Sequence, residues 1–220
     1  MKRRPKQVRC PTEDFCRLRF AAARRRDGFS LIELFAVAAI MLLLVVYYWG
    51  PSNRASRQRQ AQKDCQTRLQ KIHMALAIYA SDHAGRFPEL AGARSSEEPL
   101  DALVPRYTVD TAVFICPGSK DAPLPAGDSL RKHRISYSYY MGRSATDSQQ
   151  VLMSDQQVNT QSKAVGDYAF SRAGTRPGNN HGRWGGNLLF CDGHTEFTAP
   201  RLPFALALTN GVVLLNPKPR

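Results

Sequence analysis

The chain has 220 residues, of which 43% are hydrophobic, and its 31 Lys and Arg against 18 Asp and Glu give a net charge of +13. This length allows one modest domain plus an anchoring segment and excludes a large multidomain enzyme. Residues 1–28 carry +7 of that charge, which leaves +6 for the rest. The overall basicity is therefore weak evidence for nucleic-acid binding.

The first predicted element is a basic leader, residues 1–28, which lacks apolar periodicity and is expected to be disordered. A run from Leu31 to Trp49 follows that is apolar except for Glu33. Its length matches an α-helix crossing about 30 Å of hydrocarbon, so the sequence predicts a membrane-spanning helix. A carboxylate deep in a bilayer costs about 2.5–3.5 kcal/mol, so the sequence predicts that Glu33 has a partner.

The segment Gly28-Phe29-Ser30-Leu31-Ile32-Glu33-Leu34 resembles the cleavage and methylation motif of type IV prepilins and type II secretion pseudopilins. The resemblance implies that a prepilin peptidase cuts between Gly28 and Phe29 on the cytoplasmic face and methylates the new amine of Phe29. Glu33 would then face that amine on a neighbouring subunit. The alternative is a plain signal anchor in which Glu33 reaches the interface. Secretory and twin-arginine signals fit less well.

The same resemblance implies an α+β, pilin-like fold, in which a long N-terminal helix with a transmembrane half and an amphipathic half packs on a small antiparallel sheet. The expected protein is a non-enzymatic pseudopilin without a required cofactor, lying in the inner membrane with a cytoplasmic N-terminus and a periplasmic head. Its expected partners are the prepilin peptidase, other pseudopilins and the inner-membrane secretion platform. The expected parts are a cleaved leader (1–28), a transmembrane and assembly helix (29–50), an amphipathic extension (51–85), a head (86–200) and a C-terminal extension (201–220).

Within the amphipathic extension, apolar residues recur every three or four positions and form one face of a helix, namely Cys65, Leu69, Ile72, Leu76 and Tyr79. Gly85, with Pro88 beyond it, is a typical helix stop. His73 on this helix is expected to be a partly exposed surface residue. The block from Cys65 to Pro88 is similar to the corresponding helix and turn of pseudopilins that carry a C-terminal His…Asp-Gly motif.

Several strands are predicted after the helix. Val113–Pro117 reads as a short strand, Ile135–Gly142 as a half-buried strand, and Val151–Asp155 as a strand that ends in an acid. Asp192-Gly193 predicts a two-residue type I′ hairpin. Residues 202–215 predict a further hairpin or an added edge strand.

Cys65, Cys116 and Cys191 lie beyond the leader, which itself holds Cys10 and Cys16. In an oxidising compartment one pair of the three can form a disulfide, with the third thiol buried or free, and the sequence leaves the pairing open. The chain has no CxxC spacing, which argues against a structural zinc site.

His181 and Asp192-Gly193 resemble the family's His-X9-Asp-Gly motif, although ten residues separate His181 from Asp192 here. His181, Asp192 and Asp155 are the candidate metal ligands, and the resemblance makes Ca²⁺ the candidate ion because some pseudopilins bind calcium. A hairpin turn explains Asp192 without any chemistry. An anchored metal-dependent hydrolase is a further alternative, which predicts an ion at His181 and Asp192.

A second function class is a DNA-binding minor pilin of a DNA-uptake or type IV pilus system. The remaining +6 and the basic run Arg131–Arg134 favour it, and the aromatic residues of 135–142 have the rings needed to stack on bases. The basic residues precede those aromatics instead of alternating with them, so nucleic acid is the less favoured partner. Salt-sensitive DNA binding would support this alternative.

Overall fold

A computed structural model describes residues 30–209 and 211–219. For residues 49–55 it describes the backbone only. Gly28 and Phe29, the predicted processing site, lie outside the described residues. The chain divides into two compact units, Met1–Tyr48 and Trp49–Arg220. The helix α1, Leu31–Asp82, has its first 18 residues in the first unit and the rest in the second.

The first unit contains a segment, Leu31–Tyr48, that is long and apolar enough to cross a membrane, and all its side chains are exposed. The carbonyl of Ser30 accepts hydrogen bonds from the backbone N–H groups of Glu33 and Leu34, at 2.9 and 3.1 Å, and so begins the helix. Glu33 lies in the first turn of α1, where the helix dipole favours a negative charge.

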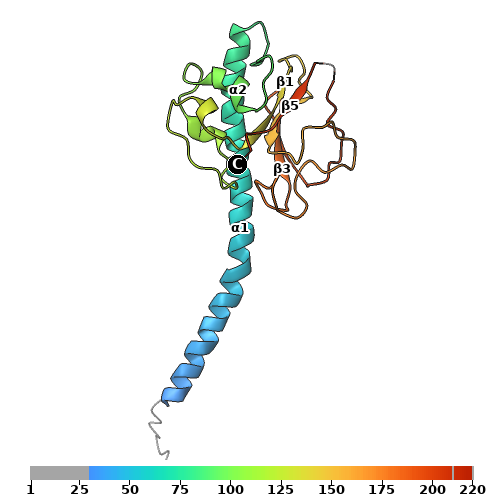
Figure 1. Ribbon diagram of the computed structural model, residues 1–220. Helices are drawn as coiled ribbons and strands as arrows, with labels where there is room; N and C mark the ends of the chain where they lie inside the picture. The colour runs from blue at the N-terminus through green and yellow to red at the C-terminus, as the bar shows by residue number, and fades with distance from the viewer. Residues whose placement is uncertain (1–29, 210, 220) are drawn as a thin grey trace, which may run out of the picture. The chain divides into compact units, whose positions relative to one another are not determined.

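The second unit, which we call the head from here on, includes the C-terminal part of α1. It is α+β, with a five-stranded antiparallel sheet in the order β4-β3-β2-β1-β5. In Figure 1 the turquoise C-terminal part of α1 runs along this unit, with β1, β3 and β5 on one side of it. The helices and strands after α1 are α2 Glu97–Leu100, the 3-10 helices η1 Asp101–Leu103, η2 Thr111–Phe114 and η3 Leu130–Lys132, then β1 Tyr137–Met141, β2 Val151–Asp155, β3 Gly186–Phe190, β4 Thr195–Thr198 and β5 Val213–Leu215.

The predicted apolar face of α1 is confirmed. Leu69, Ile72 and Leu76 are fully buried, and they belong to one core with Tyr139 and Leu189 of the sheet. Burying a side chain of this size stabilises the fold by about 1.5–3 kcal/mol. Helix α1 ends at Asp82, close to the predicted stop at Gly85.

The opposite face of the sheet is also covered, which corrects the expectation of a half-buried strand at 135–142. Tyr140 and Leu188 pack there in a second core with Phe170, Leu202 and Leu206. Because residues 163–170 and 201–208 cover this face, β2 and β3 are buried along their whole length. Residues after 200 are therefore part of the head.

The end of the chain contributes an edge strand. Strand β5 pairs antiparallel with β1, so of the two alternatives for residues 202–215 the added edge is the one that forms. The buried Glu97 carboxylate accepts hydrogen bonds from the backbone N–H groups of Ile135 and Lys218, both at 3.0 Å. These bonds tie the last residues to α2.

The predicted strand at Val113–Pro117 is wrong, because η2 occupies Thr111–Phe114. Val113, Phe114, Ile115 and Cys116 are all buried, but they belong to no strand of the described sheet. Arg68 of α1 donates to the carbonyls of Ala112, at 3.0 Å, and Ile115, at 2.5 Å. These carbonyls therefore bond to a side chain instead of to a neighbouring strand.

The predicted hairpin between β3 and β4 is confirmed, but its turn differs from the predicted type I′. Only Gly193 has a positive φ, of 92°, whereas type I′ needs positive φ at both central residues. The N–H of Gly193 donates to the Phe190 carbonyl, and the N–H of Phe190 donates to the His194 carbonyl, both at 3.0 Å. This is a three-residue loop closed by a glycine bulge.

We expect Gly193→Ala to destabilise the head more than Gly211→Ala, by about 1 kcal/mol. Both glycines have similar φ values, 92° and 87°, so both substitutions introduce similar backbone strain. A Cβ at Gly193 lies 2.7 Å from the His73 ring, which hydrogen-bonds the Cys191 carbonyl through Nε2 at 3.0 Å, whereas at Gly211 nothing lies within 4 Å. Equal losses in chemical denaturation would show that the His73 contact is unimportant.

Candidate functional site

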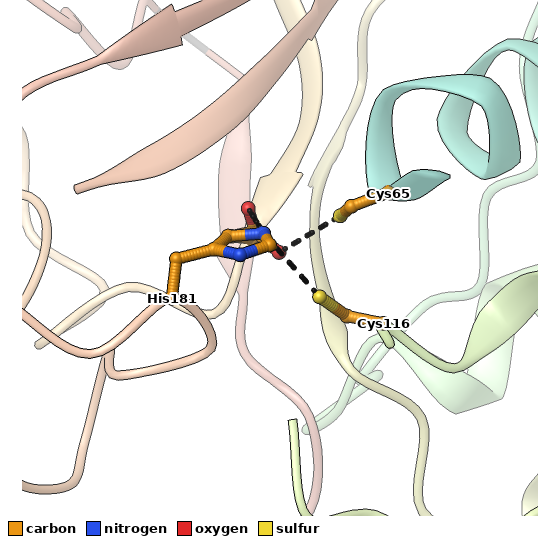
Figure 2. Close-up of side chains that lie close together, drawn as sticks. Cys65, Cys116 and His181 are labelled. Atoms are coloured by element: carbon orange, nitrogen blue, oxygen red, sulfur yellow. Dashed lines mark hydrogen bonds and ion pairs between the residues drawn. The ribbon is translucent and has the colours of Figure 1, made fainter. Parts of the chain in front are cut away.

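Four chemically active side chains from distant segments meet in the interior of the head. They are Cys65 of α1, Cys116 after η2, Asp155 at the end of β2 and His181 in the loop before β3, and their ligand atoms all lie within 4.8 Å of one another. Figure 2 shows Cys65, Cys116 and His181 pointing toward a common centre. We call these four residues the Cys-Asp-His cluster.

The contacts within the cluster are short. Cys65 Sγ donates to Asp155 Oδ1 at 3.4 Å, and Cys116 Sγ lies 3.4 Å from His181 Nε2. His181 Nε2 also lies 3.2 Å from Asp155 Oδ2. The hydroxyl of Tyr137, on β1, lies 3.3 Å from Cys65 Sγ and extends the cluster toward the sheet. The dashed lines in Figure 2 mark such contacts among the side chains drawn.

Two asparagines hold the carboxylate of Asp155 in place. Asn180 Nδ2 donates to Oδ1 at 2.8 Å, while Asn187 donates to Oδ2 from its backbone N–H at 2.7 Å and from Nδ2 at 3.1 Å. Strands β2 and β3 pair Ser154 with Leu188. The next residue of β2 is Asp155, whose side-chain carboxylate accepts the backbone N–H of Asn187 in β3. This explains why an acid can be fully buried at a strand end.

The electrostatics of the metal-free cluster follow from its burial and its pairing. Burial disfavours a charged imidazole, but the Asp155 carboxylate outweighs it and raises the pKa of His181 to about 10. Burial likewise opposes ionisation of Asp155, but His181 and the asparagine donors lower its pKa. The contact between His181 and Asp155 thus favours the charged form of each group.

The two thiols of the cluster differ. Burial and the hydrogen bond with Cys116 raise the pKa of Cys65 well above its ordinary value. Burial works against a thiolate at Cys116 too, but the hydrogen bond from Cys65 and the contact with His181 lower its pKa. Cys116 is thus the more readily ionised thiol.

The arrangement does not suit nucleophilic catalysis. A nucleophile–base–acid relay needs the acid on one imidazole nitrogen and the nucleophile on the other. Here Cys116, Asp155 and Asn187 all contact Nε2, and Nδ1 has no partner among the described residues. All four side chains belong to residues no more than 1% exposed, so a substrate has no access to them.

Of the predicted metal ligands, the structure brings His181 and Asp155 together and leaves Asp192 apart. Asp192 lies on the exposed β3–β4 turn, where it pairs with His194. Calcium prefers six to eight oxygen ligands. The Cys-Asp-His cluster instead offers two sulfurs, one nitrogen and one carboxylate, which does not suit calcium.

The three predicted cysteines are unpaired thiols, all buried. Cys65 and Cys116 are neighbours in the cluster, whereas Cys191 lies at the end of β3, beside the hairpin turn. In the sequence, both cluster cysteines are candidates only for a disulfide. Asn180 and Asn187 give no signal there beyond the polar run around His181.

Comparison with family models, curated proteins and solved structures finds no match to this chain.

Proposed function

We propose that this chain is a non-enzymatic, pilin-like subunit, a pseudopilin of a type II secretion-type system, anchored in the inner membrane and assembled into a periplasmic filament. The observation that carries the proposal is the exposed apolar segment Leu31–Tyr48 with a single acid, Glu33, in its first turn. The chain would be processed by a prepilin peptidase and would assemble with other pseudopilins on a membrane platform.

A simple anchor gives no reason for Glu33, because a carboxylate there opposes insertion. A neighbouring subunit with a free amine at Phe29 supplies the missing opposite charge. A buried carboxylate paired with an ammonium is far better tolerated than an unpaired one, and the pairing fixes the register of adjacent helices.

The head supports the same proposal. The apolar face of α1, with Leu69, Ile72 and Leu76, is packed against an antiparallel sheet, which is the α+β arrangement expected of a pilin-like protein. A protein that assembles through an N-terminal helix needs a folded domain that stays soluble outside the membrane. Placing residues 1–28 in the cytoplasm and the head in the periplasm follows from this proposal.

The DNA-binding alternative finds little support in the head. All four residues of the run Arg131–Arg134 contact acids, with Arg131 on Asp101 at 3.2 Å, Lys132 and His133 on Asp128, and Arg134 on Asp121 at 2.9 Å. The tyrosines of β1 are at most 1% exposed and cannot stack on bases. These cations are matched by protein carboxylates instead of being left for phosphates.

The processing step tests the proposal directly. We expect the intact mass of the protein extracted from native membranes to correspond to residues 29–220 with one added methyl group on Phe29. The same chain expressed without a prepilin peptidase serves as the control and should retain residues 1–28. An uncut chain recovered from native membranes would contradict the proposal.

A further inference from the structure

We propose that the Cys-Asp-His cluster is a structural binding site for one divalent transition metal ion, of which zinc fits best. Cys65, Cys116, Asp155 and His181 would supply one ligand atom each. This inference goes beyond the proposed function, because it concerns how the head is held together and not what the chain assembles into.

The spacing of the ligand atoms fits a small tetrahedral ion. Zinc bonds of about 2.3 Å to sulfur and 2.0–2.2 Å to nitrogen or oxygen give tetrahedral edges of about 3.3–3.8 Å. Cys65 Sγ lies 3.4 Å from Asp155 Oδ1, and Cys116 Sγ lies 3.4 Å from His181 Nε2. The other carboxylate oxygen, Asp155 Oδ2, lies 3.2 Å from His181 Nε2, so either oxygen is close to one further ligand atom. Every remaining separation is within 4.8 Å, so small side-chain shifts complete the site.

The types of ligand select among ions. Two sulfurs, an imidazole nitrogen and a carboxylate suit zinc and disfavour calcium and magnesium, which prefer oxygen. The site is closed, since four protein ligands fill a tetrahedral shell and the residues are buried. A closed site of this kind is structural, whereas catalytic zinc keeps a position open for water.

The surroundings of the cluster resemble the outer shell that orients metal ligands. Asn180 and Asn187 hold the carboxylate of Asp155 from three N–H groups, and Tyr137 contacts Cys65. A small polar hollow of about 50 Å³ is lined in part by Asn180 and by Gly118, which lies next to the His181 ring.

An ion at this position would tie α1 to three segments of the head. The Cys65–Asp155 contact spans 90 residues, and the Cys116–His181 contact spans 65. The main competing arrangement is a disulfide between Cys65 and Cys116, which would use two of the four groups and leave no site for an ion.

The test uses full-length protein extracted in detergent under anaerobic conditions. Elemental analysis after zinc loading and dialysis is expected to find about one zinc per chain. Cobalt loading of the same wild-type protein is expected to give the visible absorption of a tetrahedral ion with sulfur-to-metal charge transfer. The cobalt measurement requires no variant, so it is informative even if a substitution impairs folding.

Cys116→Ser is expected to weaken zinc binding at least about a hundredfold, and Cys191→Ser, which removes a buried thiol outside the cluster, is the matched control expected to keep one zinc. Zinc should raise the Tm of the wild type and of Cys191→Ser, and leave that of Cys116→Ser unchanged. Loss of zinc in both variants would overturn the proposal. Wild-type protein that takes up no metal, whether its thiols are reduced or Cys65 and Cys116 are disulfide-bonded, would also overturn it.

Discussion

Asp155→Asn is expected to lower the free energy of unfolding of the metal-free protein by about 3–5 kcal/mol, a large share of the 5–15 kcal/mol that holds a typical domain together. The carboxylate is fully buried and accepts hydrogen bonds from Cys65, Asn180 and Asn187 beside its contact with His181. An amide in its place leaves the imidazolium of His181 without its counter-charge. It also turns an N–H group toward at least one of the asparagine donors.

Asp128→Asn is the matched control. Asp128 also pairs with a histidine, His133, at 2.9 Å, and with Lys132 at 3.0 Å, but its side chain is 30% exposed. Solvent replaces the lost partner there, so we expect almost no change in the denaturation midpoint. Urea unfolding of both variants in the presence of a chelator separates the ion pair from any metal effect. Equal midpoints for the two variants would show that the buried pair does not hold the head together.

The amphipathic face of α1, β1, β2 and the β3–β4 hairpin could be predicted because each depends on a local pattern. A short stretch of sequence is enough to show the apolar face with Leu69 and Ile72, and also the turn at Asp192-Gly193. The strand predicted at Val113 failed because Arg68, far away in the chain, binds the carbonyls there. A contact between residues so far apart cannot be predicted from the few residues around Val113.

Only half of the Cys-Asp-His cluster could be predicted, for a similar reason: His181 and Asp155 were candidate metal ligands, whereas Cys65 and Cys116 were not. A zinc site is read from sequence when two ligands stand close together, as in CxxC. Here each ligand comes from a different segment, and the nearest pair along the chain, Asp155 and His181, is separated by a long irregular stretch. Asp192 was favoured because it stands next to a glycine in a motif, but its turn faces solvent.

Glu33→Ala is expected to insert into the membrane as well as the wild type and to reduce filament assembly at least tenfold. A charge at the centre of the bilayer costs about 2.5–3.5 kcal/mol and one near the end of the span costs less, so removing the carboxylate eases insertion and anchoring should not suffer. In the filament, the substitution leaves the amine of a neighbouring subunit without a partner. Truncating one member of a buried charge pair costs about 2–5 kcal/mol, and each 1.4 kcal/mol is a factor of ten.

Two further variants separate charge from shape. Glu33→Gln preserves the size of the side chain and should assemble as poorly as Glu33→Ala, whereas Glu33→Asp keeps the charge and should recover part of the assembly. Ile40→Leu, an apolar exchange elsewhere on the exposed segment, should assemble normally. Assembly is measured as the pelleted, cross-linkable fraction of membrane-extracted protein, after confirming equal membrane content. If Glu33→Gln assembles like the wild type, the charge of Glu33 does not set the register, and the apolar surface of Leu31–Tyr48 must do so by packing alone.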